Sequence, residues 1–351
     1  MPAPVPATTS LVYDPLKAAF YGRFVNAAYT MYDNHPDNPT PPTVELPDKY
    51  NFVAWVQMRD FIFEEGDWTF YGMLAHNPGT DDYVLAIRGT SDPTEWWDDL
   101  TSMVPWQWEA FGGDVGYGFF RIYQTLRMIA PLQGQALIEA APAGQGESLE
   151  AAGGFADQVA EAVRRHAAET QPATAPATAV AQKSVTVVAH SLGSALATLY
   201  VADNSLTKKV KTPLLCTLAS PRVGDYTFAT NFNNLNIPSW RIVNELDIVP
   251  KLPIFPFWHI DTEHIYNSGA STVWSLGCWH SIDTYLNLLD PKQPLLKSCV
   301  WPPKVAAVAA APLRAQTRPA RGAAALPSSA GQDIAITAPA GTTINITIKV
   351  G

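Results

Sequence analysis

The N-terminal part of the chain has apolar residues at helical spacing. Within 14–32, Leu16, Phe20 and Phe24 stand four positions apart, and further apolar residues follow at three- and four-residue steps. This spacing predicts an amphipathic helix. The next segment, 35–47, is rich in proline and asparagine and predicts the end of that helix. Three later segments are also expected to be helical, namely 117–128, 148–169 and 194–203.

Short, mainly apolar runs lie between these helices and are typical of buried strands. The clearest are 83–87, 185–188 and 214–218, which have the composition expected of parallel strands covered on both faces. Mixed aromatic and β-branched residues indicate further strands at 52–63, 68–74 and 240–243. Strands that alternate with helices predict an α/β protein in which crossover helices join neighbouring strands of one sheet.

Two changes of composition indicate how the chain is divided. The segment 171–181, rich in alanine, proline and threonine, is expected to be a surface loop. Alanine and proline also dominate 302–330, which we interpret as a linker. Isoleucines alternate with small polar residues in the last segment, as in a β-hairpin. We therefore expect a main domain over 1–301, a linker over 302–330 and a hairpin-like tail over 331–351.

Composition and charge exclude several classes of protein. The 351 residues are 47% hydrophobic and 11% aromatic, which excludes disorder along the whole chain. Lysine and arginine number 23 against 32 aspartates and glutamates, so the net charge is −9. No basic stripe is available to neutralise phosphates, and we expect no nucleic acid partner.

The N-terminus and the apolar runs bear on the compartment. The first ten residues, MPAPVPATTS, lack the positive and apolar regions of a signal peptide. No apolar run approaches the roughly 20 residues of a transmembrane helix. We therefore expect no transmembrane segment and a soluble protein, either cytoplasmic or secreted after removal of a signal.

A buried strand runs directly into a helix at 189–193, which reads AHSLG. The small residues Ala189 and Gly193 stand two positions before and after Ser191, as the tight turn of a nucleophile elbow requires. At the start of the helix, Ser191 would lie beside free backbone N–H groups that stabilise an oxyanion. The pattern predicts a catalytic serine; the alternative is a serine that caps an ordinary helix.

A nucleophilic serine needs a base and an acid. His280 lies late in the chain at a loop-to-helix junction, and Asp247 follows the strand 240–243. With Ser191 they have the order Ser, acid, His that is typical of α/β-hydrolases. Competing acids are Glu245, Asp225 and Asp261.

The remaining histidines are interpreted as structural. His190 adjoins the serine, but its side chain leaves the turn in another direction. We expect the side chains of His35, His76 and His166 to be solvated, whereas His259 and His264 are expected to be polar strand residues.

An oxyanion hole needs two donors near the serine. The backbone N–H of Leu192 directly after the nucleophile is one. The loop after strand 83–87 supplies the other, since Gly89 permits a close backbone approach and Thr90 offers an N–H and a hydroxyl.

The three cysteines do not form a metal motif. Cys278 and Cys299 are compatible with one disulfide or with two free thiols, and Cys216 is expected to be a small buried residue. Because no CxxC pair is present, we expect no zinc site.

Five motifs, in this order, resemble the class 3 lipases, the fungal-type triacylglycerol lipases and their bacterial relatives. They are AIRGTSDPTEWWDDL, AHSLGSALA, TLASPRVGD, NELDIVPKLP and CWHSIDTYL. The resemblance covers roughly 84–289. It implies an α/β-hydrolase fold, with a mostly parallel central sheet flanked by helices and a lid helix.

The resemblance also implies roles for individual residues. Ser191, Asp247 and His280 correspond to a catalytic triad, and Thr90 and Leu192 to an oxyanion hole.

The lid helix would span about 92–99, with Trp96 and Trp97 facing the substrate; packing in the core is the alternative for these tryptophans. An apolar segment, 254–258, either lines an acyl pocket or is simply buried. This chain has Ala189 in place of the first glycine of the elbow. It has Gly116 where the family usually has histidine.

The expected function is hydrolysis of water-insoluble acyl esters by a serine carboxylic-ester hydrolase, a triacylglycerol lipase, through an acyl-enzyme intermediate. We expect no metal and no organic cofactor. The partner is a lipid or acyl-ester substrate at an oil–water interface. The alternatives are an esterase for shorter or aromatic, feruloyl-type esters, a phospholipase A1, and an inactive α/β-hydrolase scaffold used for binding.

Overall fold

The computed structural model describes residues 11–34, 42–59, 68–90, 100–131, 146–170 and 183–301, together with the backbone of β14 (Ile334–Thr337) and β15 (Thr343–Ile346). The chain divides into two compact units, Met1–Lys304 and Val305–Gly351. In the second unit β14 and β15 pair antiparallel. The predicted loop 171–181 and lid helix 92–99 lie outside the described residues.

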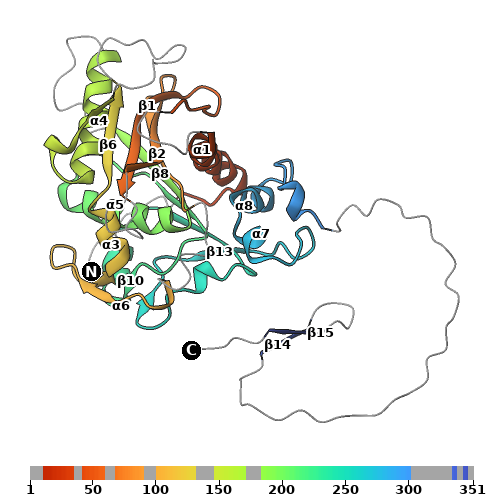
Figure 1. Cartoon of the computed structure of the whole chain (residues 1–351). Helices are drawn as coiled ribbons and strands as arrows, with labels where there is room; N and C mark the ends of the chain where they lie inside the picture. Colours follow the sequence, from red (N-terminus) through yellow and green to blue (C-terminus); the bar gives the residue numbers. More distant parts are fainter. Residues whose placement is uncertain are drawn as a thin grey trace, which may run out of the picture. The chain divides into compact units, whose positions relative to one another are not determined.

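In the described part of the first unit, nine strands form one sheet (Figure 1). They are β1 (Asn51–Arg59), β2 (Trp68–Asn77), β3 (Asp82–Ile87), β6 (Arg127–Pro131), β7 (Gly146–Ser148), β8 (Ser184–His190), β9 (Leu215–Leu218), β11 (Ser239–Asn244) and β13 (Glu263–Tyr266). Their order is β13–β11–β9–β8–β3–β2–β1–β6–β7. The five neighbours from β13 to β3 run parallel, as predicted, and the other four strands extend the sheet antiparallel.

Helices cover both faces of this sheet. On one face lie α1 (Pro15–Asn34) and α8 (Ile282–Leu289); on the other lie α3 (Tyr117–Tyr123), α4 (Phe155–Thr170) and α5 (Leu192–Thr207) (Figure 1). The alternation of a strand sends Val84 and Ala86 into the core on the α1 side, and Leu85 and Ile87 into the core on the α5 side. Because both faces are buried, the central strands can be almost continuously apolar.

A smaller four-stranded sheet lies beside the main one. It contains β4 (Pro105–Gln107), β5 (Asp114–Gly116), β10 (Gly224–Asp225) and β12 (Phe257–Trp258), in the order β12–β10–β5–β4. The helix α6 (Tyr226–Asn233) follows β10 directly, and its Phe228 is fully buried. In the described part of the chain, no helix combines the length and the hydropathy needed to cross a membrane.

Two predicted helices are shorter than the sequence pattern indicates. The helix predicted over 117–128 ends at Tyr123, because Arg127 begins β6 and pairs with Gln57 of β1. The helix predicted over 148–169 begins only at Phe155, since Gly153 adopts a left-handed φ of 121° and 146–148 belongs to β7. Pairing at the sheet edge overrides the local helical pattern in both cases.

The prediction that His76 and His166 are solvated is wrong, because both side chains are buried. The ring of His76 lies 4.5 Å from that of Tyr83 and 4.6 Å from that of His166. Nδ1 of His166 hydrogen-bonds the Tyr83 hydroxyl at 3.0 Å. Burial, together with the nearby His76 and Lys183, lowers the pKa of His166 to about 4.

Because the imidazole of His166 is buried, we expect the folded protein to lose stability in acid. In the unfolded chain His166 takes up a proton near pH 6.5, whereas in the folded protein it does so only near pH 4. The folded state therefore loses stability as the pH falls from 6.5 to 4, by at most about 3 kcal/mol. We expect His166→Asn, which keeps a polar atom near Nδ1, to weaken that loss. Urea unfolding at several pH values measures this loss of stability. If the free energy of unfolding falls equally with pH in the wild type and in His166→Asn, the assignment to His166 is contradicted.

Candidate active site

The turn between β8 and α5 places Ser191 at the start of a helix in a strained conformation. Its φ is 56°, in the left-handed region that non-glycine residues rarely adopt. A Cβ on Gly193 would collide with backbone oxygens of Ile87 and Arg88. A Cβ on Gly89 would lie 2.7 Å from that of Ser191. The small residues that the sequence places around this turn are therefore required by its packing.

Three buried side chains form a hydrogen-bonded row at this turn. Nε2 of His280 lies 2.7 Å from Oγ of Ser191, and Nδ1 lies 2.7 Å from Oδ2 of Asp247. Because the carboxylate can only accept, the Nδ1–H donates to Asp247 and Nε2 is free to accept from the serine hydroxyl. Asp247 follows β11, and His280 ends α7 (Leu276–His280). The arrangement fits a Ser–His–Asp triad.

The carboxylate of Asp247 is held by two further donors. The backbone N–H of Val249 donates to Oδ1 at 3.0 Å, and the Tyr285 hydroxyl donates to Oδ2 at 2.8 Å. The same hydroxyl accepts the backbone N–H of Asn244 at 3.1 Å. Burial, and then the Asp247 charge, raise the pKa of Tyr285 well above its ordinary value, so it remains a donor. The sequence analysis missed this tyrosine, although it lies in the motif CWHSIDTYL.

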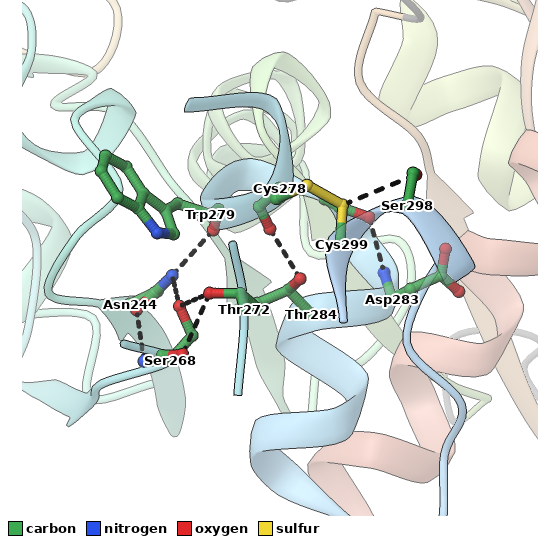
Figure 2. Close-up of a disulfide and its surroundings, with 10 residues drawn as sticks. Asn244, Ser268, Thr272, Cys278, Trp279, Asp283, Thr284, Ser298 and Cys299 are labelled. Carbon is green, nitrogen blue, oxygen red and sulfur yellow. Dashed lines mark hydrogen bonds between the residues drawn. A yellow bond between two sulfur atoms is a disulfide. The ribbon is translucent and has the colours of Figure 1, made fainter. Parts of the chain in front are cut away.

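The backbone just before His280 is fixed by side chains and by a disulfide (Figure 2). A disulfide joins Cys278 to Cys299, so the alternative of two free thiols is excluded. The carbonyl of Cys278 accepts from Oγ1 of Thr284 at 2.6 Å. The carbonyl of Trp279 accepts from Nδ2 of Asn244 at 2.8 Å. Two consecutive peptide groups are thus fixed in orientation.

His190 holds the next carbonyl and links three segments of the site. Its Nε2–H donates to the backbone oxygen of His280 at 2.8 Å, so Nδ1 accepts from the hydroxyl of Tyr29, also at 2.8 Å. That hydroxyl in turn accepts the backbone N–H of Gly89 at 2.8 Å. Burial, and then the neighbouring His280, lower the pKa of His190 well below its ordinary value. The neutral imidazole therefore connects α1, the loop after β3 and the segment of His280.

A small cavity of about 10 Å³, room for about one water molecule, lies beside the serine. Its lining is mainly apolar: Thr90, Leu100, Phe119, Ser191, Leu192, Pro221 and Val249. Both residues predicted for the oxyanion hole, Thr90 and Leu192, are therefore next to Ser191. Trp96 and Trp97, predicted for the lid, lie outside the described residues.

The segment 254–258 takes no part in lining this cavity, so the prediction that it lines an acyl pocket is not supported. Ile254 and Phe255 are exposed, and only Phe257 is deeply buried.

The competing acids and histidines have other structural roles. Asp225 caps α6 by accepting the backbone N–H of Phe228, and Glu245 accepts from Nδ2 of Asn267 at 2.7 Å. Asp261 is exposed and accepts the N–H of Thr262. Of the histidines, His259 donates to the carbonyl of Pro250, while His264 stacks on Tyr13.

The glycine at position 116 is explained by its neighbours. A Cβ on Gly116 would lie 2.7 Å from the ring of Phe119 and 3.0 Å from the side chain of Met103. Because Phe119 lines the cavity beside Ser191, a larger residue at 116 would displace part of that lining.

A second groove, formed by β7, α4 and the 3-10 helix Glu150–Ala152, offers no comparable chemistry. Its cations Arg164, Arg165 and Lys209 are each ion-paired with a carboxylate that also lines it, as in the pair of Lys209 and Asp157. In the described residues, no group of three or more His, Cys, Asp or Glu side chains could hold a metal ion.

The sequence of this chain is similar to those of a known protein family. The family model described as "Lipase (class 3)" matches residues 84–257. The rice protein Phospholipase A1-II 4 (Oryza sativa subsp. japonica) is 29% identical over 241 residues, which cover 64% of this chain and 55% of that protein. A lipase of Rhizomucor miehei is 36% identical over 121 residues, covering 30% of this chain and 33% of that one. The chain thus spans about half the length of the curated relatives with which it aligns most broadly.

Solved structures show the same fold. A nonglycosylated lipase of Yarrowia lipolytica superposes with a TM-score of 0.50 at 18% identity, over 74% of this chain and 83% of that one. The Rhizomucor miehei lipase propeptide complex gives a TM-score of 0.50 at 20% identity, over 82% and 88%. The predicted α/β-hydrolase fold is confirmed.

We expect the disulfide to contribute a measurable part of the free energy of unfolding. It joins residues 21 positions apart, and a loop of that length stabilises the folded state by about 3 kcal/mol in the chain-entropy model. We expect the double variant Cys278→Ser/Cys299→Ser to lose about that much free energy of unfolding in a urea titration. A thiol reductant should destabilise the wild type equally and leave the double variant unchanged. A reductant without effect on the wild type would contradict the prediction.

Proposed function

Because the chain belongs to the class 3 lipase family of α/β-hydrolases, we propose that it hydrolyses lipid esters with Ser191 as nucleophile, His280 as base and Asp247 as the orienting acid. The observation that carries this proposal is the 2.7 Å contact between Nε2 of His280 and Oγ of Ser191. The base is itself bound to a buried carboxylate at 2.7 Å. A serine that merely capped a helix would need neither partner.

The geometry supports a two-step reaction. Ser191 Oγ attacks the ester carbonyl while its proton moves to Nε2 of His280, and the protonated histidine then gives that proton to the leaving alcohol. Water, activated by the same histidine, hydrolyses the acyl-enzyme and restores the serine. Asp247 holds Nδ1–H and stabilises the imidazolium without taking the proton.

The oxyanion of each tetrahedral intermediate is assigned to the backbone N–H groups of Leu192 and Thr90. Leu192 is the first residue of α5, so its N–H lies at the positive end of the helix dipole. Thr90 follows Gly89, whose N–H is bound by the Tyr29 hydroxyl, and Arg88 donates to the Gly89 carbonyl at 2.7 Å. Both peptide groups of this loop are therefore held, as a preorganised oxyanion hole requires.

The proposed substrate is a water-insoluble acyl ester, most simply a triacylglycerol at an oil–water interface. Leu100, Phe119 and Val249 offer an apolar wall next to the serine, which suits an acyl chain better than a polar acyl group. Phospholipase A1 is a second candidate, favoured by the breadth of the alignment with the rice protein of that name. An esterase for short or aromatic esters and an inactive binding scaffold stay as alternatives.

The nucleophile is tested by substitution. We expect Ser191→Ala to lower kcat for p-nitrophenyl butyrate about ten-thousand-fold or more, because the acyl-enzyme cannot form. Ser205→Ala is the matched control. Ser205 lies on the same helix, and its hydroxyl donates to the carbonyl of Ala202 within its own turn. Equal rates for Ser191→Ala and the wild type would refute the enzymatic proposal.

The substrate class is tested by a chain-length series. If an acyl chain is buried next to Ser191, each added methylene contributes up to about 0.8 kcal/mol, so kcat/KM should rise about tenfold or more from acetate to octanoate esters. Fatty acid release from trioctanoin and from dioctanoylphosphatidylcholine then separates the two lipid candidates. Preference for acetate would count against both, and faster release from the phospholipid would favour phospholipase A1.

A further inference from the structure

Tyr29 and His190 lie beside the triad, and the proposed chemistry uses neither of them. The hydroxyl of Tyr29 accepts the backbone N–H of Gly89 at 2.8 Å and donates to Nδ1 of His190 at 2.8 Å. Nε2–H of His190 donates to the backbone oxygen of His280, also at 2.8 Å. A row of three hydrogen bonds therefore runs from the loop assigned to the oxyanion hole to the backbone of the base.

The two ends of this row fix the direction of every hydrogen bond in it. The backbone N–H of Gly89 can only donate, and the carbonyl of His280 can only accept. Nε2 of His190 must therefore carry a proton, and burial of this side chain, which is 2% exposed, keeps the imidazole neutral. Nδ1 is then an acceptor, so the Tyr29 hydroxyl donates to it and offers a lone pair to Gly89. One arrangement of protons thus satisfies all three bonds.

At one end, the row holds a loop that packs against the nucleophile. A Cβ on Gly89 would lie 2.7 Å from Cβ of Ser191 and 2.7 Å from the hydroxyl of Tyr29. The N–H of Thr90 belongs to the same peptide group as the Gly89 carbonyl, which accepts from Arg88 at 2.7 Å. Because Thr90 directly follows Gly89, a loop displaced from Tyr29 would also displace the N–H that is assigned to the oxyanion.

At the other end, the ring of His190 packs among the side chains that hold the base. Its centroid lies 4.8 Å from that of the His280 ring and 5.7 Å from that of Tyr285, the tyrosine that donates to Asp247. A positive charge on His190 would oppose the imidazolium that forms on His280, since like charges repel strongly at this distance in a buried site. The neutral imidazole that the hydrogen bonds require is therefore also the state that suits proton transfer.

We propose that Tyr29 and His190 are positioning residues, which keep the oxyanion hole and the base at a fixed separation during the reaction. The proposal rests on the proposed lipid-ester hydrolysis. Neither residue exchanges a proton with the substrate; each holds a backbone group beside one that takes part in the chemistry. Stabilisation of a transition state depends on donors that are already in place, so loosening this row should slow catalysis without weakening substrate binding.

Tyr29→Phe tests the row at its centre, because it removes the hydroxyl and keeps the ring. We expect kcat for p-nitrophenyl butyrate to fall about ten- to a hundredfold, less than the loss of an oxyanion-hole donor itself would cause. KM should change by less than about twofold, since the displaced donor acts on the transition state and not on the bound ester. A Tyr29→Phe protein with the kcat of the wild type would overturn the proposal.

Tyr83→Phe is the matched control, because it breaks the same kind of hydrogen bond, from a buried tyrosine to Nδ1 of His166 at 3.0 Å. Tyr83 lies near the start of β3 and Gly89 follows its end, about 20 Å away at the usual rise per residue. This variant should lower the melting temperature as Tyr29→Phe does and leave kcat unchanged. An equal fall of kcat in both variants would show a general loss of stability and would contradict positioning.

Two substitutions of His190 separate its hydrogen bond from its packing. The side-chain amide of His190→Gln reaches the place of Nε2 and donates to the carbonyl of His280, whereas His190→Leu fills similar space without a donor. We expect the glutamine variant to retain at least about fivefold more kcat than the leucine variant. Thermal melting checks that both are folded. Equal losses of kcat in the two folded variants would overturn the role assigned to His190.

Amide hydrogen exchange tests the row apart from catalysis. In the full-length protein, the amide of Gly89 should exchange at least about tenfold faster in Tyr29→Phe than in the wild type, because it loses its acceptor. In Tyr83→Phe its exchange should match the wild type. Unchanged exchange in Tyr29→Phe would overturn the proposal whether or not the protein hydrolyses esters. A wild type that hydrolyses no ester but shows this difference in exchange would refute the proposed function and leave the hold of Tyr29 on the loop established.

Discussion

The position of one imidazole ring is the constraint on which the site depends. His280 must lie within hydrogen-bonding distance of Ser191 on one side and Asp247 on the other, at 2.7 Å each. A hydrogen bond weakens steeply when its angle or length departs from these values. The backbone that carries the ring is accordingly fixed at consecutive carbonyls, by Thr284 and Asn244 before the ring and by His190 at the ring itself.

The donors that fix this backbone come from elements whose own places are set by burial. His190 ends β8, a strand covered on both faces, and Asn244 ends β11 in the same parallel sheet. The carboxyl ends of parallel strands meet at one edge of a sheet, where side chains from distant parts of the chain converge. The core and the site therefore depend on the same packing, because the apolar runs that form the buried strands also position these donors.

Tyr29 shows how far this coupling extends. It lies on α1, at the other end of the domain sequence, yet its hydroxyl joins the Gly89 peptide to His190. Packing of α1 against α8 and the strands brings it there. A helix that looks like a purely structural cover in the sequence therefore supports the loop assigned to the oxyanion hole.

Local sequence rules predicted much of this arrangement. The apolar runs at 83–87, 185–188 and 214–218 correspond to β3, β8 and β9, and the 14–32 periodicity to α1. The elbow was predictable because only small residues fit its turn, and Gly89 and Gly193 are now seen to have no room for a side chain. The catalytic roles of Ser191, Asp247 and His280 stay a prediction, although the structure brings the three together.

Chain order and spacing by themselves predicted the class of fold and the candidates for the site, since a strand, a turn and a helix are encoded by neighbouring residues. The contact of Asp247 with His280, which separates this acid from its competitors, is seen only in the tertiary structure. Only the tertiary structure decided which distant groups complete the site. Tyr29, His190 and Tyr285 carry no local signature of their roles, and their partners lie far away in the chain. The burial of His166 and the disulfide have the same cause: each depends on which distant segments packing brings together.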